Sequence, residues 1–147
     1  MFNSVLTYCI SLWVGLNKFE LEDLQILQNK AIRVVTRMPP RSNRKQMFEE
    51  TGYMTLNQLI FYHTVLNIFK IRKVKEPEYL YNLISNENIR EQIIHEKTNL
   101  TLTTKGFIFR GIENWNSIPP DIKNNTTISR FKNQVQGWIN KNIPFSP

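Results

Sequence analysis

The sequence is poor in the residues from which cross-links and metal centres are built. It holds one cysteine, Cys9, among 147 residues. A single thiol excludes an internal disulfide and a thiolate-rich zinc site, and it suits a reducing compartment. The two histidines, His63 and His95, lie far apart and form no HExxH motif. We therefore predict no metal and no other cofactor.

Residue patterns typical of catalysis are also scarce. The only aspartates are Asp23 and Asp121, so the adjacent aspartates of a polymerase metal site are missing. The chain has no GxSxG motif and no glycine-rich loop that could hold a phosphate. We predict that it is not an enzyme and has no small-molecule substrate. An enzyme would require a clustered acidic or histidine-bearing pocket.

The chain has no apolar run of the eighteen or more residues that a membrane span requires. Residues 1–17 carry no charged side chain. The apolar stretch within them therefore has no basic n-region before it, and several polar residues interrupt it. This pattern favours a core helix over a signal peptide. We expect an intracellular protein, in the nucleus or the cytoplasm, without a membrane partner.

The composition is that of one folded domain with a basic surface. Hydrophobic residues make up 41% and charged residues 21% of the chain, which is ordinary for a globular protein. Nineteen Lys and Arg against twelve Asp and Glu give a formal charge of +7. Such a charge favours polyanions, with nucleic acid first and an acidic protein or lipid surface as alternatives. We predict a single helical domain over residues 1–147, with a loose subdivision near 76–105.

Hydrophobic periodicity predicts a mainly α fold, a compact irregular domain of about five to six helices. Apolar spacing and end signals place helices at 2–14, 21–38, 46–51, 56–73, 107–115 and from Thr127 or Ser129 onward. Gly52 is expected to end the helix at 46–51 and Thr55 to cap the helix at 56–73, which is the most apolar of the set and the expected centre of the core. One or two short helices are expected within 78–97. Residues 99–104 alternate in polarity and form at most a minor extended strand.

Two sets of apolar residues are predicted to be buried. In the helix at 21–38, the expected core-facing series is Leu24, Leu27, Ala31, Val34 and Val35. Among the aromatic residues, helical spacing assigns Trp13, Phe69, Trp115 and Trp138 to the core rather than to stacking on bases.

A run of basic residues is the sharpest local feature. The segment 24–48 contains no acidic residue, and its six cations are Lys30, Arg33, Arg37, Arg41, Arg44 and Lys45. The first three recur at intervals of three and four, so a helix places them in one stripe. A stripe of this kind suits a chain of phosphates. A solvated helix face is an equally good interpretation of the same pattern.

Two further basic clusters carry weaker signals. Lys70, Arg72, Lys73 and Lys75 come at the expected end of the helix at 56–73, where cations complement the helix dipole whatever the function. The segment 123–147 also holds four cations and no acidic residue.

Three segments together resemble a known family. They are Leu6-Thr-Tyr-Cys-Ile-Ser-Leu-Trp13, Leu24-Gln-Ile-Leu-Gln-Asn-Lys-Ala-Ile-Arg33, and Trp115-Asn-Ser-Ile-Pro-Pro-Asp-Ile-Lys123 followed by Ser129-Arg-Phe-Lys132. In this order they resemble the region after the palm in reverse transcriptases of jockey-type non-LTR retrotransposons. Cys9 and Val14 stand where that family often has glycine.

The resemblance implies a role without polymerase activity. The palm and its aspartate pair are missing, so the chain would be a truncated copy of an RNA-directed DNA polymerase, a domesticated remnant or the tail of a polyprotein. Segments after the palm are expected to hold template RNA or an RNA–DNA duplex, and this role carries over to Lys30, Arg33 and Arg37. The alternatives are a protein-interaction or scaffold module, open to self-association, and a remnant without function.

Overall fold

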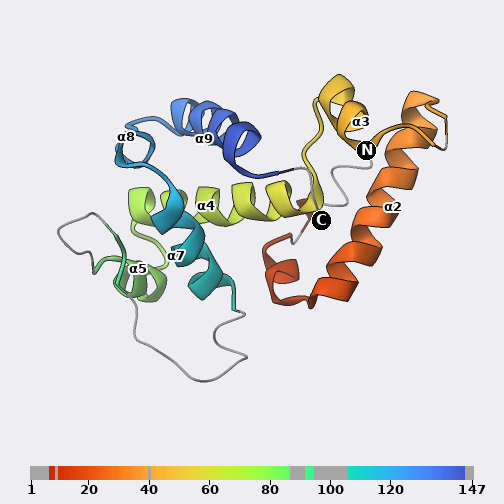
Figure 1. Ribbon diagram of the computed structural model, residues 1–147. Coiled ribbons are helices and arrows are strands. Elements are labelled where there is room, and N and C mark those ends of the chain that lie inside the picture. The colour runs from red at the N-terminus through yellow and green to blue at the C-terminus, as the bar shows by residue number, and fades with distance from the viewer. Residues whose placement is uncertain (1–6, 9, 40, 87–91, 95–105, 145–147) are drawn as a thin grey trace.

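The computed structural model describes residues 7–8, 10–39, 41–86, 92–94 and 106–144 (Figure 1). Within these ranges the chain forms seven α-helices and one 3₁₀ helix, so the predicted mainly α class is confirmed. None of these helices is both long and apolar enough to cross a bilayer. The strand expected at 99–104 lies outside the described residues.

The N-terminal part consists of η1 (Ile10–Gly15), α2 (Lys18–Thr36) and α3 (Arg44–Thr51). The sequence predicted a helix of 3.6-residue periodicity over 2–14. The structure instead has the 3₁₀ helix η1 in the described part of this segment. α2 starts earlier than predicted because Asn17 and Glu20 form a capping box, in which each side chain accepts a hydrogen bond from the other's backbone N–H. Gly52 ends α3 with a positive φ of 66°, as its sequence position indicated.

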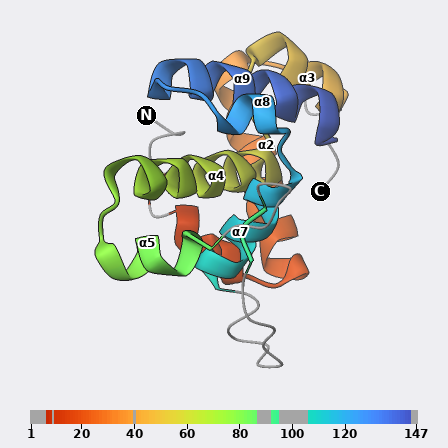
Figure 2. The same cartoon turned by 90° about the vertical axis from the view of Figure 1, so that its left-hand side faces the viewer.

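The centre of the fold is α4 (Leu56–Val74), which contacts η1, α2, α5, α7 and α9. Figures 1 and 2 show α4 running between α9 on one side and α5 and α7 on the other. Thr55 caps its N-terminus together with Gln58, so the predicted N-cap is confirmed. Its central place was also expected from its apolar sequence.

The C-terminal part packs around α4. It comprises α5 (Glu78–Ile84), α7 (Phe107–Ser117), the single turn α8 (Pro120–Lys123) and α9 (Ile128–Asn142). α7 approaches α4 closely at Gly111, where an added Cβ would lie 3.2 Å from the Ile68 side chain. Pro120 begins α8 at a position where its missing N–H costs no hydrogen bond.

The main core lies between the C-terminal two thirds of α4 and helices α5, α7, α8 and α9. The Phe69 and Phe131 rings stack at 3.9 Å, and Trp115 lies beside Phe131. Phe69 and Trp115 are therefore core residues as predicted. Trp13 and Trp138 also pack against the hydrophobic clusters, but they lie at the edges and are only partly buried, less than expected.

The face of α2 that packs on the rest of the protein is largely polar, and the core prediction for this helix was wrong for three of its five residues. Its buried residues are Gln25, Gln28, Asn29 and Ile32. Three members of the predicted core series are exposed instead: Leu27 at 56%, Val34 at 78% and Val35 at 64%. α2 is thus turned so that much of its apolar surface points away from the protein.

A buried hydrogen-bond network explains this orientation. Gln25 accepts from the backbone N–H of Leu56 at the first turn of α4 (2.8 Å) and donates to the side chains of Gln28 and Asn29 (2.7 and 3.0 Å). Gln28 in turn donates to the carbonyl of Met54 (2.9 Å). Because the free N–H groups at a helix start need acceptors, these amides join α2 to α4, beside the apolar contact that Leu21 and Leu24 make with the start of α4.

The segment after Trp115 is held by side-chain hydrogen bonds to the backbone. Ser117 donates to the nearby Asn114 carbonyl. Asn116 instead bonds over a long range, because its side chain both accepts from the N–H of Ile93 and donates to the Ile93 carbonyl (2.9 and 3.0 Å).

Candidate nucleic-acid interface

The end of α2 determines where the predicted basic stripe goes. The N–H of Arg37 bonds to the carbonyl of Val34, and the N–H of Met38 bonds to that of Arg33 (3.4 and 3.1 Å). With Arg37 in the left-handed region, at φ 54° and ψ 28°, this is a Schellman motif. The position favours glycine, so an arginine here is held at some cost in backbone strain.

A short turn then brings the remaining cations back toward α2. Ser42 bonds to the Pro39 carbonyl through both its N–H (3.0 Å) and its hydroxyl (2.6 Å). Asn43 caps α3 by accepting from the N–H of Lys45 (2.9 Å). Met38, Met47 and Phe48 pack with Ile32 of α2, so Arg41, Arg44 and Lys45 lie beside the C-terminal end of that helix.

Five of the six predicted site residues lie at the surface, and one is turned inward. Lys30, Arg37, Arg41 and Lys45 are exposed, and Arg44 is partly exposed. Arg33 differs, because its guanidinium Nη2 donates to the Ser42 carbonyl (3.5 Å) and its Nε is buried without a hydrogen-bond partner. Arg33 therefore supports the turn, and the surface cluster consists of the other five.

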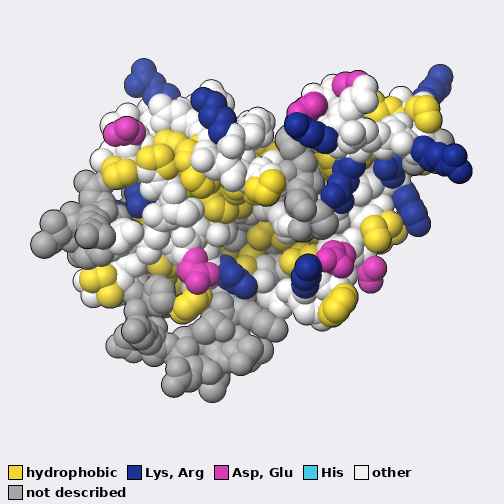
Figure 3. Space-filling view, in the orientation of Figure 1, with side chains coloured by type: hydrophobic (Ala, Val, Ile, Leu, Met, Phe, Trp, Pro, Cys, Tyr) yellow, Lys and Arg dark blue, Asp and Glu magenta, His cyan; other side chains and the backbone are white. Residues whose placement is uncertain are grey.

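Acidic residues do little to neutralise this cluster. Glu20 is engaged in the α2 capping box, and Glu22 lies 3.7 Å from Lys18. Within the described part of the chain, the one ion pair of the cluster joins the exposed Lys45 and Glu49 at 3.8 Å. Figure 3 shows basic side chains along the right-hand side of the molecule, over α2 and α3. This surface can attract phosphates.

The second basic cluster is divided between surface and core. Lys70, Lys73 and Lys75 are exposed near the end of α4. The Arg72 guanidinium lies over the Trp115 ring at 5.3 Å and donates to the Ile84 carbonyl (3.5 Å). Arg72 therefore helps to enclose the core. Of the C-terminal cations, Lys123 is buried, whereas Arg130, Lys132 and Lys141 are exposed.

His63 on α4 is half-buried in a basic environment. Burial lowers its pKa from the ordinary 6.5, and the charges of Lys70 and Lys132 lower that pKa further. The ring also makes an edge contact with Tyr62 at 5.3 Å. Because both charged neighbours are cations, the folded protein favours the neutral imidazole.

The lowered pKa of His63 predicts a loss of stability in acid. The unfolded chain takes up this proton at about pH 6.5, and the folded chain takes it up only at lower pH. The free energy of unfolding should therefore decline as the pH falls below 6.5. Urea denaturation over a pH series should show a weaker decline for His63→Gln than for the parent chain. An identical pH dependence in the variant would assign the acid sensitivity to other groups.

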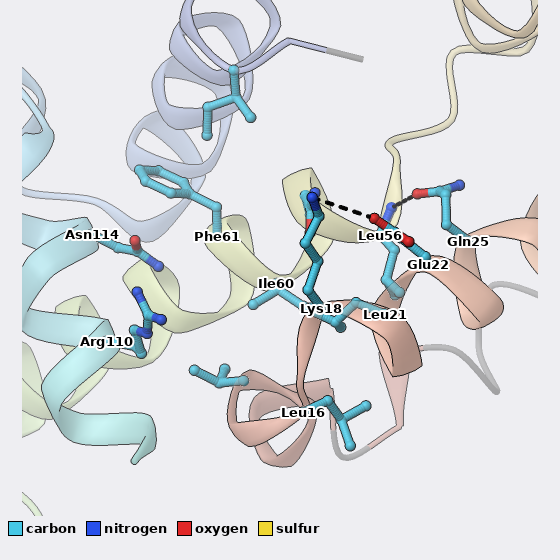
Figure 4. A pocket seen from close by; sticks show the side chains of 13 residues that line it. Leu16, Lys18, Leu21, Glu22, Gln25, Leu56, Ile60, Phe61, Arg110 and Asn114 are labelled. Carbon is cyan, nitrogen blue, oxygen red and sulfur yellow. Dashed lines mark hydrogen bonds and ion pairs between the residues drawn. The ribbon is translucent and has the colours of Figure 1, made fainter. Parts of the chain in front are cut away.

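A pocket of about 500 Å³ lies between α2, α4 and α7 (Figure 4). Most of its polar side chains are engaged with the protein. Lys18 pairs with Glu22, Arg110 with Glu113 at 3.4 Å, and Asn114 donates to Thr64 at 2.8 Å. In the described ranges, no group of three or more metal-ligating side chains occurs here or elsewhere.

No protein-family model, no curated protein and no solved structure matches this chain. The resemblance to retrotransposon reverse transcriptases thus rests on the sequence motifs and remains a prediction. Sequence reasoning missed the outward apolar face of α2. The sequence did hold a signal of a polar side on this helix, because the glutamines at 25 and 28 are three residues apart and so share one side of a helix.

Proposed function

We propose that this protein binds RNA or an RNA–DNA duplex, without sequence preference and without catalysis, through the cations at the C-terminal end of α2, the following turn and α3. The supporting observation is that five cations share one surface and only Lys45 has an acidic partner within the described residues. Phosphate contacts of this kind supply most of the affinity in nonspecific binding.

The motif resemblance suggests the origin and the ligand class. A segment that follows the palm of a non-LTR reverse transcriptase would lie near template RNA and the primer duplex.

Binding should weaken with salt and depend on the cations of this surface. If roughly four of them contact phosphate, log affinity should fall against log salt with a slope of about −3 to −4. Replacing Arg37 and Arg41 with Gln should reduce this slope by roughly one to two. Both side chains are exposed, so folding should be nearly unchanged. Fluorescence anisotropy with labelled RNA and RNA–DNA duplex, over a salt series, measures the effect.

Two controls separate a defined surface from a diffuse charge effect. Lys70→Gln with Lys73→Gln removes the same charge from an exposed part of α4 and should change binding less. Arg37→Gly and Lys75→Gly form a matched pair, because both cations end a helix with positive φ. Both should relieve strain, but only Arg37→Gly should weaken binding. Equal losses at the two surfaces would indicate a mere polycation.

A protein-interaction module is the second candidate, favoured by the exposed apolar residues of α2. If neither the parent chain nor its variants bind RNA or duplex at low salt, this interpretation or that of a remnant without function replaces the first.

A further inference from the structure

The outward face of α2 is a mixed apolar and charged stripe. Six residues at helical intervals form it: Phe19, Asp23, Ile26, Leu27, Lys30 and Val34. They lie opposite the buried Gln25, Gln28, Asn29 and Ile32 on the 3.6-residue repeat of the helix. Phe19 and Val34 are exposed by 77% and 78%. Exposed large apolar side chains that are grouped in this way usually mark an interaction surface.

The order of residues along the stripe is symmetric. Its midpoint falls between Ile26 and Leu27. Moving outward in both directions, Asp23 corresponds to Lys30, and Phe19 corresponds to Val34. The stripe therefore carries opposite charges at equal distances from an apolar centre, with an apolar residue beyond each charge.

Both charged residues of the stripe are available. Asp23 and Lys30 are exposed, and neither takes part in an ion pair or hydrogen bond within the described part of the chain. The other acidic side chains of α2 are engaged, Glu20 in the capping box and Glu22 with Lys18. Asp23 and Lys30 are also seven residues apart, too far to pair along one helix.

We propose that the occupant of this face is a second copy of the chain, with the two α2 helices packed antiparallel about a two-fold axis between Ile26 and Leu27. In this arrangement each Asp23 faces Lys30 of the other copy, Ile26 meets Leu27, and Phe19 meets Val34. A two-fold interface must be self-complementary, and the symmetric order of this stripe meets that requirement.

The cations of the proposed nucleic-acid surface other than Lys30 lie outside this interface. Arg37, Arg41 and Arg44 come at and beyond the C-terminal end of α2. Lys30 is assigned to the contact between copies. The test of self-association uses no nucleic acid, so its outcome is independent of the proposed function.

The interface is small, and the dimer should be weak. α2 has 19 residues, so it is about 28 Å long, and one pair of such helices buries less surface than a permanent dimer needs. A dissociation constant on the order of 10 μM is expected for the parent chain. Sedimentation equilibrium over a range of protein concentrations measures it.

Charge reversal tests the antiparallel register. Asp23→Lys replaces both Asp23–Lys30 contacts of the dimer by contacts between two lysines. Lys30→Asp replaces both by contacts between two aspartates. Each single variant should weaken dimerisation by about tenfold or more. The double variant should restore the parent constant. An equimolar mixture of the two single variants should also form a heterodimer, because the opposed charges then match at both places.

The apolar centre needs a matched control. Leu27→Ser should weaken the dimer, whereas Val74→Ser on α4 should not, although the two side chains are similarly exposed at 56% and 62%. Circular dichroism checks that each variant remains folded. The proposal is overturned if the parent chain stays monomeric, if the single reversals leave dimerisation unchanged, or if the double variant and the mixture fail to restore it.

Discussion

Replacement of Trp115 by alanine is expected to lower the free energy of unfolding by about 4 kcal/mol, the usual cost of removing a large buried aromatic side chain. Trp115 is 2% exposed. Its ring lies 6.0 Å from that of Phe131 and beneath the Arg72 guanidinium. A loss of this size is a large share of the stability of a small domain. Urea denaturation, with the slope of the transition compared between variants, measures it.

Two further substitutions make the Trp115 result interpretable. The Trp115 Nε1 is buried without a hydrogen-bond partner, so Trp115→Phe loses no such bond and should cost much less than the alanine variant. Trp138 is partly buried and stacks on Phe61 at 5.4 Å, and Trp138→Ala should cost less than half as much as Trp115→Ala. Equal losses at the two tryptophans would contradict the position of the core described here.

Gln25→Leu is expected to cost about 3 kcal/mol, although it replaces a polar buried side chain with an apolar one of similar size. The change leaves the Leu56 N–H without its acceptor and removes a donor from Gln28 and Asn29. Each buried polar group left unpaired costs about 1–3 kcal/mol. Chemical denaturation followed by circular dichroism measures the loss.

Gln46→Leu is the matched control for Gln25→Leu. Gln46 lies on α3, and its side chain bonds to Glu50 at an exposed position. Its replacement should change stability by less than about 0.5 kcal/mol. If Gln25→Leu were equally mild, the amide network would not be what attaches α2 to α4.

Features specified locally could be predicted from the sequence. Thr55 and Gly52 act through their own and neighbouring backbone groups, so the start of α4 and the end of α3 were readable. The apolar periodicity of residues 56–73 likewise indicated α4 as the centre of the core. Neighbouring helices bury ten residues of α4. Its central position could therefore be predicted without deciding which face of the helix is buried.

Apolar spacing alone predicted the wrong orientation for α2, because the hydrogen-bond partners of its buried amides are distant in sequence. Hydrophobicity ranked Leu27 and Val34 above Gln25 and Gln28, yet the glutamines find hydrogen-bond partners at residues 54 and 56. Arg33 was assigned to the candidate site for a similar reason. Its inward turn depends on the loop that follows α2 and brings the Ser42 carbonyl within reach.

In the proposed dimer, the distance between Arg37 and the middle of α2 determines how long a nucleic-acid strand must be to reach the basic surfaces of both copies. Arg37 lies about ten residues beyond the Ile26–Leu27 midpoint, so the two basic ends of an antiparallel pair would be roughly 30 Å apart at 1.5 Å per residue. A strand long enough to reach both ends would meet the second at an effective concentration on the order of millimolar. Apparent affinity would then rise steeply with strand length once that span is reached.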